Sequence, residues 1–313
     1  MNLLDRQLLF VTGKGGVGKT SVAAALAQLA AKSGRRTLLC EMDDKGAVAA
    51  AFDTKPLAFQ PRQLDTNLWA MAMNTEDALR EYLRLFVKLP FVGRIGPLAR
   101  TFDFVADAAP GVKEILVVGK LAYEVRERHY DLVVVDAEAT GHIVAQIGAP
   151  RVIGDLVKVG MVRDQTKWVS DILEDPARTG LVIVTTPEEM PVSETIDLIG
   201  RLDAESGVEP SAIVANRVLP ALFDRRQSEI VDALEEAEDV LVDATGAGVR
   251  QVLAAAHVTE ARRRVGGRHL EGLRDAIPPS LPVLYVPELF TRATGRRVVS
   301  LVATALADEL DVV

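Results

Sequence analysis

The stretch Phe10-Val11-Thr12-Gly13-Lys14-Gly15-Gly16-Val17-Gly18-Lys19-Thr20 decides the fold. It fits the pattern G-x-x-x-x-G-K-T, follows a short apolar run, and precedes an alanine-rich stretch with helical spacing. Glycines in such a loop let backbone N–H groups turn toward phosphate oxygens, and the N-terminus of the next helix adds partial positive charge. The sequence therefore predicts a phosphate-binding loop between a strand and a helix.

Each part of this loop has an expected role in binding ATP. Lys19 is expected to reach the β- and γ-phosphates, and the Thr20 hydroxyl is expected to ligate Mg²⁺. Asp136 ends the apolar run 132–135 and is expected to hold the same ion, directly or through water. The alternative for Asp136 is that it caps the following helix. The loop residues expected to contact the nucleotide are Gly13, Gly15, Gly16, Val17, Gly18, Lys19, Thr20 and Ser21.

A second acidic group follows the second expected strand, as Glu41-Met42-Asp43-Asp44. A carboxylate here can orient the attacking water, which is the usual contribution of the protein to phosphoryl transfer. We assign this role to Asp43; the alternative is that these acids only cap the next segment. Lys19 and Asp43 are therefore predicted to be catalytic.

Short apolar runs alternate with helical patterns along the chain. This alternation predicts an α/β fold with a doubly wound, mostly parallel sheet, in one P-loop domain over residues 1–313. Roughly 90 residues separate the second strand from the strand ending at Asp136, far more than one crossover needs. We therefore expect a helical insertion subdomain at 53–128 and a second mostly helical stretch at 222–277. The expected strands are 7–12, 36–41, 132–135, 181–185, 212–215 and 283–286, and the expected helices are 21–32, 75–88, 113–128, 192–205, 226–238 and 296–309.

Composition excludes several other classes of protein. The net charge is −8 and no long basic stripe is present, which argues against nucleic-acid binding. The arginines Arg262, Arg263, Arg264 and Arg268 are interpreted as a solvated helix face. No apolar stretch is long enough to span a bilayer, so we expect no stable membrane insertion and a cytoplasmic location.

The second lysine of the loop, Lys14, resembles the deviant Walker-A class, whose consensus is K-G-G-x-G-K-[ST]. Residues 136–142 resemble the D-T-A-P-T-G-H element of the arsenite-pump and tail-anchored-protein-targeting ATPases. Residues 185–195, 215–220 and 286–290 are similar to three further elements of that family, in family order. The resemblance implies that Lys14 is a third catalytic residue, which reaches the nucleotide of a partner chain, and that Asn216 reads adenine. It also implies that the loop containing Pro287 and Leu289 lies over the base.

This sequence departs from the family pattern in three places. The first switch, 43–52, keeps Asp43 and the final Ala-Phe but lacks the Pro, the His and the second Asp. The single cysteine, Cys40, cannot reproduce the zinc site of eukaryotic members, and metalloid-binding thiols are also missing, so we expect a bacterial, zinc-free variant. The insertion lacks a methionine-rich groove; its phenylalanines line either a smaller client groove or the insertion's own core. These are Phe86, Phe91, Phe102 and Phe104.

Together these features predict a dimeric, Mg²⁺-ATP-driven conformational switch with a protein client, as a homodimer or a heterodimer with a paralogous ATPase. One alternative is a low-turnover nucleotide-binding subunit that scaffolds a paralogous partner, which the altered first switch favours. The other is a ParA/MinD-like positioning ATPase; the acidic C-terminal segment 305–313 argues against it.

Overall fold

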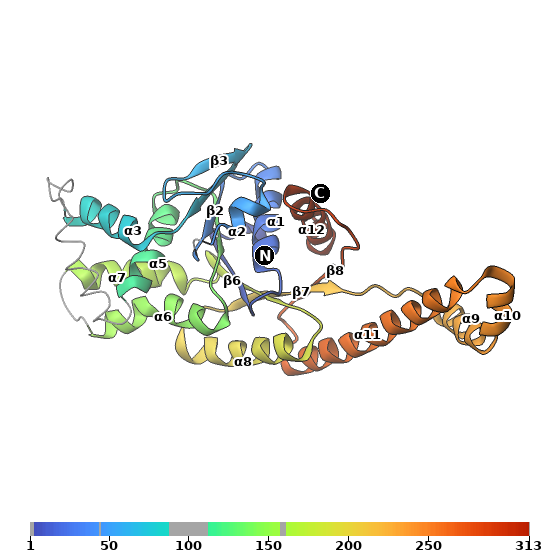
Figure 1. Ribbon diagram of the computed structural model, residues 1–313. Helices are drawn as coiled ribbons and strands as arrows, with labels where there is room; N and C mark the ends of the chain where they lie inside the picture. The colour runs from blue at the N-terminus through green and yellow to red at the C-terminus, as the bar shows by residue number, and fades with distance from the viewer. Residues whose placement is uncertain (1–2, 44, 88–111, 157–160, 313) are drawn as a thin grey trace.

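The computed structural model describes residues 3–43, 45–87, 112–156 and 161–312 (Figure 1). Its centre is an eight-stranded sheet with strand order β3-β4-β2-β5-β1-β6-β7-β8. Every neighbouring pair is parallel except β3 and β4. The strands are β1 (Leu8–Gly13), β2 (Thr37–Glu41), β3 (Arg62–Asp65), β4 (Leu68–Ala72), β5 (Leu132–Asp136), β6 (Thr179–Thr185), β7 (Pro210–Val218) and β8 (Val283–Pro287).

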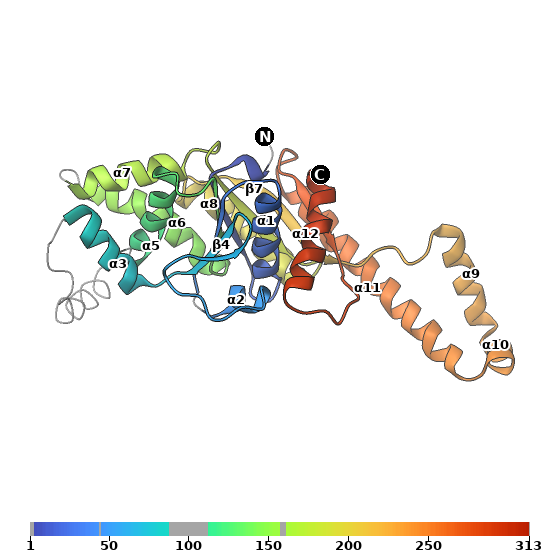
Figure 2. The ribbon, with the colours of Figure 1, turned by 90° about the horizontal axis from the view of Figure 1, so that it is seen from above.

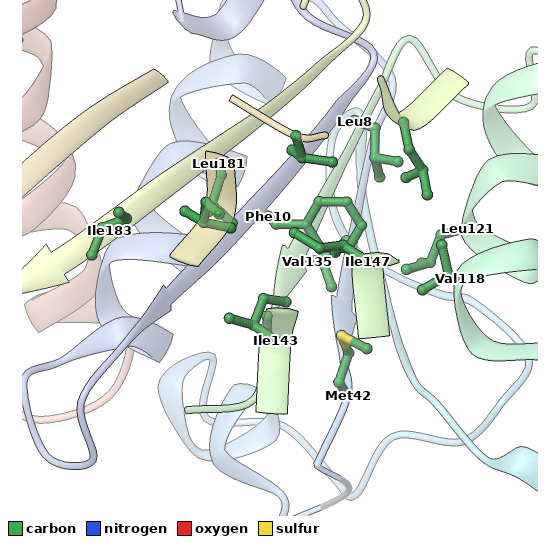
Figure 3. Close-up of a cluster of buried hydrophobic side chains, with 14 of the residues drawn as sticks. Leu8, Phe10, Met42, Val118, Leu121, Val135, Ile143, Ile147, Leu181 and Ile183 are labelled. Carbon is green, nitrogen blue, oxygen red and sulfur yellow. The ribbon is translucent and has the colours of Figure 1, made fainter. Parts of the chain in front are cut away.

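The central strands are buried on both faces, which explains their continuous apolar runs. In β1, Leu8 and Phe10 face one core cluster, and Leu9 and Val11 face the other. Figure 3 shows the first cluster, in which Phe10 lies among side chains of β5, β6 and the helices behind them. The sheet is therefore the middle layer of three.

Helices cover both faces of the sheet, as a doubly wound fold requires (Figures 1 and 2). One face is covered by α1 (Lys19–Lys32), α2 (Ala47–Ala51) and α12 (Arg296–Leu310). The other is covered by α5 (Val112–Arg126), α6 (Thr140–Leu156), α7 (Met161–Leu173), α8 (Glu189–Glu205) and part of α11 (Gly248–Ala276). The predicted α/β fold with a mostly parallel sheet is confirmed.

The segment expected to be a helical insertion differs in its first part. Residues 62–72 form β3 and β4, which extend the sheet beyond β2, so the helical part begins only with α3 (Thr75–Tyr82) and the π-helical turn η2 (Leu83–Val87). The short strand β3 is mostly exposed and carries Arg62, Gln63 and Asp65, so it lacks the apolar alternation of a half-buried strand. The helical layer also contains α6 and α7, which the sequence analysis did not predict. The side chains of Phe86, Phe91, Phe102 and Phe104 lie outside the described part of the chain.

Residues 222–277 form a projecting arm made of α9 (Arg225–Glu236), α10 (Glu238–Thr245) and α11. Both views show α9 and α10 at its outer end, away from the sheet, with α11 running back to the body (Figures 1 and 2). The 29 residues of α11 span about 43 Å at the usual helical rise. We call this segment the arm below.

Among the described residues, no helix combines the length and the apolar character that are needed to cross a membrane.

Candidate nucleotide site

The phosphate loop, Gly13–Thr20, joins β1 to α1 at the carboxyl edge of the sheet. A Cβ at Gly13 would lie 2.1 Å from the Val184 carbonyl oxygen, so only glycine fits against the neighbouring strand β6. Gly18, at the N-cap of α1, has a φ of 97° and no side chain to accept hydrogen bonds from the first turn. The first N–H groups of α1 are therefore left for phosphate oxygens.

The Asn216 side chain supports this loop from β7. Its amide donates to the Val17 carbonyl at 2.8 Å and its oxygen accepts the Arg217 N–H at 3.0 Å. A Cβ on Gly18 would lie 2.4 Å from the same amide nitrogen. Asn216 is thus buried against the loop, a contact that sequence patterns did not reveal because β7 is about 200 residues away along the chain.

Lys19 and Thr20 begin α1 and lie on the side of the loop that faces β5. The Thr20 hydroxyl donates to the Asp136 carboxylate at 2.6 Å. Burial lowers the pKa of Lys19, and the nearby carboxylates of Asp136 and Asp43 partly offset that effect. The structure therefore brings together Lys19, Thr20 and Asp136, the three residues that the sequence analysis assigned to phosphate and metal binding.

Asp136 is buried at the end of β5, and burial raises its pKa to about 6. Its Oδ1 has no hydrogen-bond partner among the described residues. A buried carboxylate oxygen without a partner is costly, and a hard cation bound by oxygen ligands would satisfy it. Asp136 together with the Thr20 hydroxyl therefore fits the oxygen-ligand chemistry of Mg²⁺.

Glu41, beside Asp136, is a residue whose importance the sequence analysis missed. It ends β2 in register with Asp136, and its side chain is buried. Its Oε1 accepts the Ala47 N–H at 2.7 Å, whereas Oε2 has no partner in the described part of the chain. Glu41 therefore ties the loop after β2 to the start of α2 and adds a second carboxylate at the edge of the site. Its position two residues before Asp43, at the end of the apolar run of β2, was the available signal.

Asp43 lies in the loop after β2 and pairs with Lys45 at 2.5 Å. About a third of its side chain is exposed, and its charge acts on Lys19. The carboxylate is thus at the predicted edge of the sheet, close enough to influence the phosphate loop. Its neighbour Asp44 lies outside the described residues.

Lys14, the second lysine of the loop, forms an ion pair with Glu194 of α8. The other oxygen of Glu194 accepts the Thr140 hydroxyl at 3.1 Å, at the start of α6. Glu194 therefore links the phosphate loop to the segment after Asp136. In this single chain the Lys14 ammonium is directed to its own α8.

The loop after β8 adds a further wall at the same edge. The Glu288 N–H donates to the Val218 carbonyl at 2.9 Å, which joins this loop to the end of β7. Leu289 packs on the core beneath α1 and α12, Pro287 is exposed, and Phe290 is 71% exposed. The loop thus lies near Asn216, where the sequence analysis placed the base.

Comparison with known proteins identifies one family, and the individual relatives agree with it. The model of the anion-transporting ATPase family matches residues 6–165 and 155–245. ATPase BagA of Mycobacterium tuberculosis is 32% identical over 256 residues, covering 78% of this chain and 75% of the relative. The putative arsenical pump-driving ATPase of Halobacterium salinarum is 30% identical, covering 74% of this chain and 39% of the relative. The arsenical pump-driving ATPase of Escherichia coli is 28% identical, covering 70% and 41%.

A phosphate loop at the carboxyl edge of a parallel sheet, with an acid at the end of the neighbouring strand, defines a P-loop nucleotide hydrolase. The chain belongs to the anion-transporting ATPase family. It is therefore an ATPase, as the resemblance implied.

Proposed function

We propose that this chain is a Mg²⁺-dependent ATP-driven conformational switch that works with a second chain. The observation that carries the proposal is the hydrogen bond between Thr20 and Asp136, next to an Asp136 oxygen without a partner. When bound, Mg²⁺ would neutralise part of the phosphate charge. Thr20 and Asp136 would hold the ion.

The remaining residues divide the work of hydrolysis. The loop N–H groups and Lys19 bind the phosphates and stabilise the charge that develops on them. Asp43 orients the attacking water. In the present arrangement Lys45 pairs with Asp43, so Asp43 acts once the negatively charged nucleotide has drawn Lys45 away from that ion pair.

Lys14 supplies a positive charge to the nucleotide of the second chain. Its ion pair with Glu194 supports a resting state in which that charge is held in its own subunit. Because Glu194 also accepts the Thr140 hydroxyl, a shift of the segment after Asp136 would release both partners together. Release of Lys14 is then coupled to the state of the metal site.

Asn216 recognises the base with the groups that the loop leaves free. Its amide retains one N–H and one acceptor lone pair beyond the bonds to Val17 and Arg217. These match the acceptor and donor of adenine, whereas guanine presents a carbonyl oxygen in place of the donor. Pro287 and Leu289 provide the apolar wall. Calorimetry with ATP and GTP tests this assignment; equal affinities would remove Asn216 from base recognition.

The second candidate, a low-turnover subunit that scaffolds a paralogous ATPase, is supported by the Asp43–Lys45 pair in an altered switch. The two proposals differ in the ATP turnover expected of the chain alone, which is low under the second. Only the first proposal includes a protein client. A kcat that rises only when a paralogous chain is added would favour the scaffold.

The experiment that tests the main proposal measures ATP hydrolysis with Mg²⁺ and with a chelator, for the wild type and for Lys19→Ala. We expect hydrolysis to require Mg²⁺ and to fall at least 100-fold in Lys19→Ala, because a preorganised donor to the developing charge is worth about 10²–10³ in rate. Lys32→Ala, at the other end of α1, is the matched control and should retain full activity. Full activity of Lys19→Ala, or hydrolysis unaffected by the chelator, would refute the proposal.

A further inference from the structure

The arm exposes apolar side chains that the chain itself does not cover. Of the eleven large hydrophobic side chains that are exposed in the described residues, seven lie on the arm. Scattered exposed apolar residues are normal, but a gathering on one projection marks an interaction surface. The seven are Leu222, Ile230, Leu234, Val240, Val252, Val258 and Val265.

The arm also separates its charges along its length. Residues 222–247 contain eight acidic and two basic residues, whereas 248–277 contain six arginines and three acidic residues. Asp232 and Asp243 on the first part, and Arg262 and Arg268 on the second, are all exposed. None of these four has an ion-pair partner among the side chains that the structure describes. The arm therefore carries an acidic surface and a basic surface that are both available to a partner.

The arm is fixed to the body at its inner end only. A Cβ on Gly266 would lie 3.0 Å from Cβ and 3.2 Å from the carbonyl oxygen of Pro187, so α11 packs closely on the segment before α8. Leu270 and Leu273 are buried near the same place. Further out, Val252 and Val258 are 67% and 60% exposed. Because the inner end of α11 is packed on the body, the uncovered outer part of the arm is held in place. Binding to a surface that is already positioned costs little conformational entropy.

We propose that the arm is a self-association surface that docks on the arm of a second copy of this chain. The acidic part, 222–247, of each copy lies on the arginine-bearing part, 248–277, of the other, and the exposed apolar side chains on the facing sides are covered between them. A two-fold axis makes both contacts identical, so one surface with both charges is complementary to itself.

The charge distribution favours a second copy over a partner of one sign. A uniformly acidic or basic partner would meet like charge on half of the arm, and like-charge contacts oppose binding. A second copy in the opposite direction meets opposite charge along the whole length. This contact needs neither nucleotide nor the action of Lys14 in trans, so it stands or falls independently of the proposed hydrolytic mechanism.

A charge-swap experiment on the full-length protein tests this inference. One variant carries Arg262→Glu and Arg268→Glu; the other carries Asp232→Lys and Asp243→Lys. Masses are measured by light scattering without nucleotide, with circular dichroism to verify folding. The matched control, Lys167→Glu with Arg201→Glu, reverses two exposed charges on α7 and α8, outside the arm.

We expect the wild type and the control to show twice the 33.8 kDa of one chain. Each arm variant alone should show one chain, because both contacts become repulsive. An equimolar mixture should recover the double mass, because each mixed pair has one reversed contact and one original contact, both attractive. A wild type that is monomeric at every concentration, arm variants with the wild-type mass, or a mixture that stays monomeric would overturn the inference.

Cross-linking provides a second readout that does not depend on charge. The chain's one cysteine, Cys40, is buried, and burial raises the pKa of its thiol, so an introduced thiol is the reactive one. With a bifunctional maleimide, Val258→Cys, which is exposed near the middle of the arm where the two-fold axis would cross it, should link two copies efficiently. Val152→Cys, which is exposed on α6, should not. Equal cross-linking at the two positions would contradict an interface on the arm.

Discussion

The nucleotide-binding body and the arm differ in how far their apolar residues are buried. In the body, β1 is buried on both faces, and ten consecutive residues of α1, 22–31, are buried. In the arm, α10 has no buried residue, and α11 buries only four of its 29. The body therefore forms its own core, whereas the arm needs another surface to cover it.

A large effect is expected at the chemical centre of the body, in the substitution Asp43→Asn. Because Asp43 is assigned to the attacking water, ATP affinity should change little while kcat falls about 10²–10⁴-fold. Affinity is measured by calorimetry and kcat by phosphate release. Asp171→Asn, on the exposed face of α7, is the control and should behave as the wild type. Wild-type kcat in Asp43→Asn would move the role to another acid.

A matched pair of leucine truncations compares the two regions directly. Leu39 of β2 is fully buried, and Leu222, in the segment of the arm before α9, is 40% exposed. Leu39→Ala should lower the free energy of unfolding by about 2–5 kcal/mol through lost burial and a cavity. Leu222→Ala should change it by no more than about 0.5 kcal/mol. Urea unfolding at low protein concentration measures both. Equal losses would mean that the arm shares the core of the body.

The raised pKa of Asp136 predicts that the free energy of unfolding depends on pH through a group in the body. Burial moves this pKa from 3.8 to about 6, so between these values the folded protein without metal binds more protons than the unfolded chain. Stability then falls as pH rises through this window, by up to roughly 3 kcal/mol from this group. Asp136→Asn should remove that component, so the difference in unfolding free energy between variant and wild type should grow from pH 4 to pH 7. If the difference in unfolding free energy between Asp136→Asn and the wild type did not change with pH, Asp136 would not be a buried carboxyl group with a raised pKa.

The sequence predicted the body much better than the arm or the loops. The phosphate loop and the strand ending at Asp136 were predictable because their chemistry is local: glycines, a lysine and an acid at fixed spacing. The contacts of Asn216 with Val17 and of Lys14 with Glu194 were not, since they join residues 199 and 180 positions apart along the chain. Strand β3 was missed because its exposed polar residues lack a strand pattern. The expected solvated arginine face was located correctly on α11, but its acidic counterpart became evident only with α9 and α10 in place.

The central claim is that hydrolysis requires Lys14 of one chain at the nucleotide of another. Its most direct test is the ATPase rate per chain over a dilution series, for the wild type, Lys14→Ala, Lys19→Ala and a mixture of the two variants. A positive group supplied in trans is worth about 10³–10⁵ in rate. The wild-type rate should therefore rise with concentration, and each variant alone should be nearly inactive. The mixture should recover part of the activity, because one of its sites has its own Lys19 and the Lys14 of the other chain. A concentration-independent rate from a monomer, unchanged in Lys14→Ala, would contradict the claim.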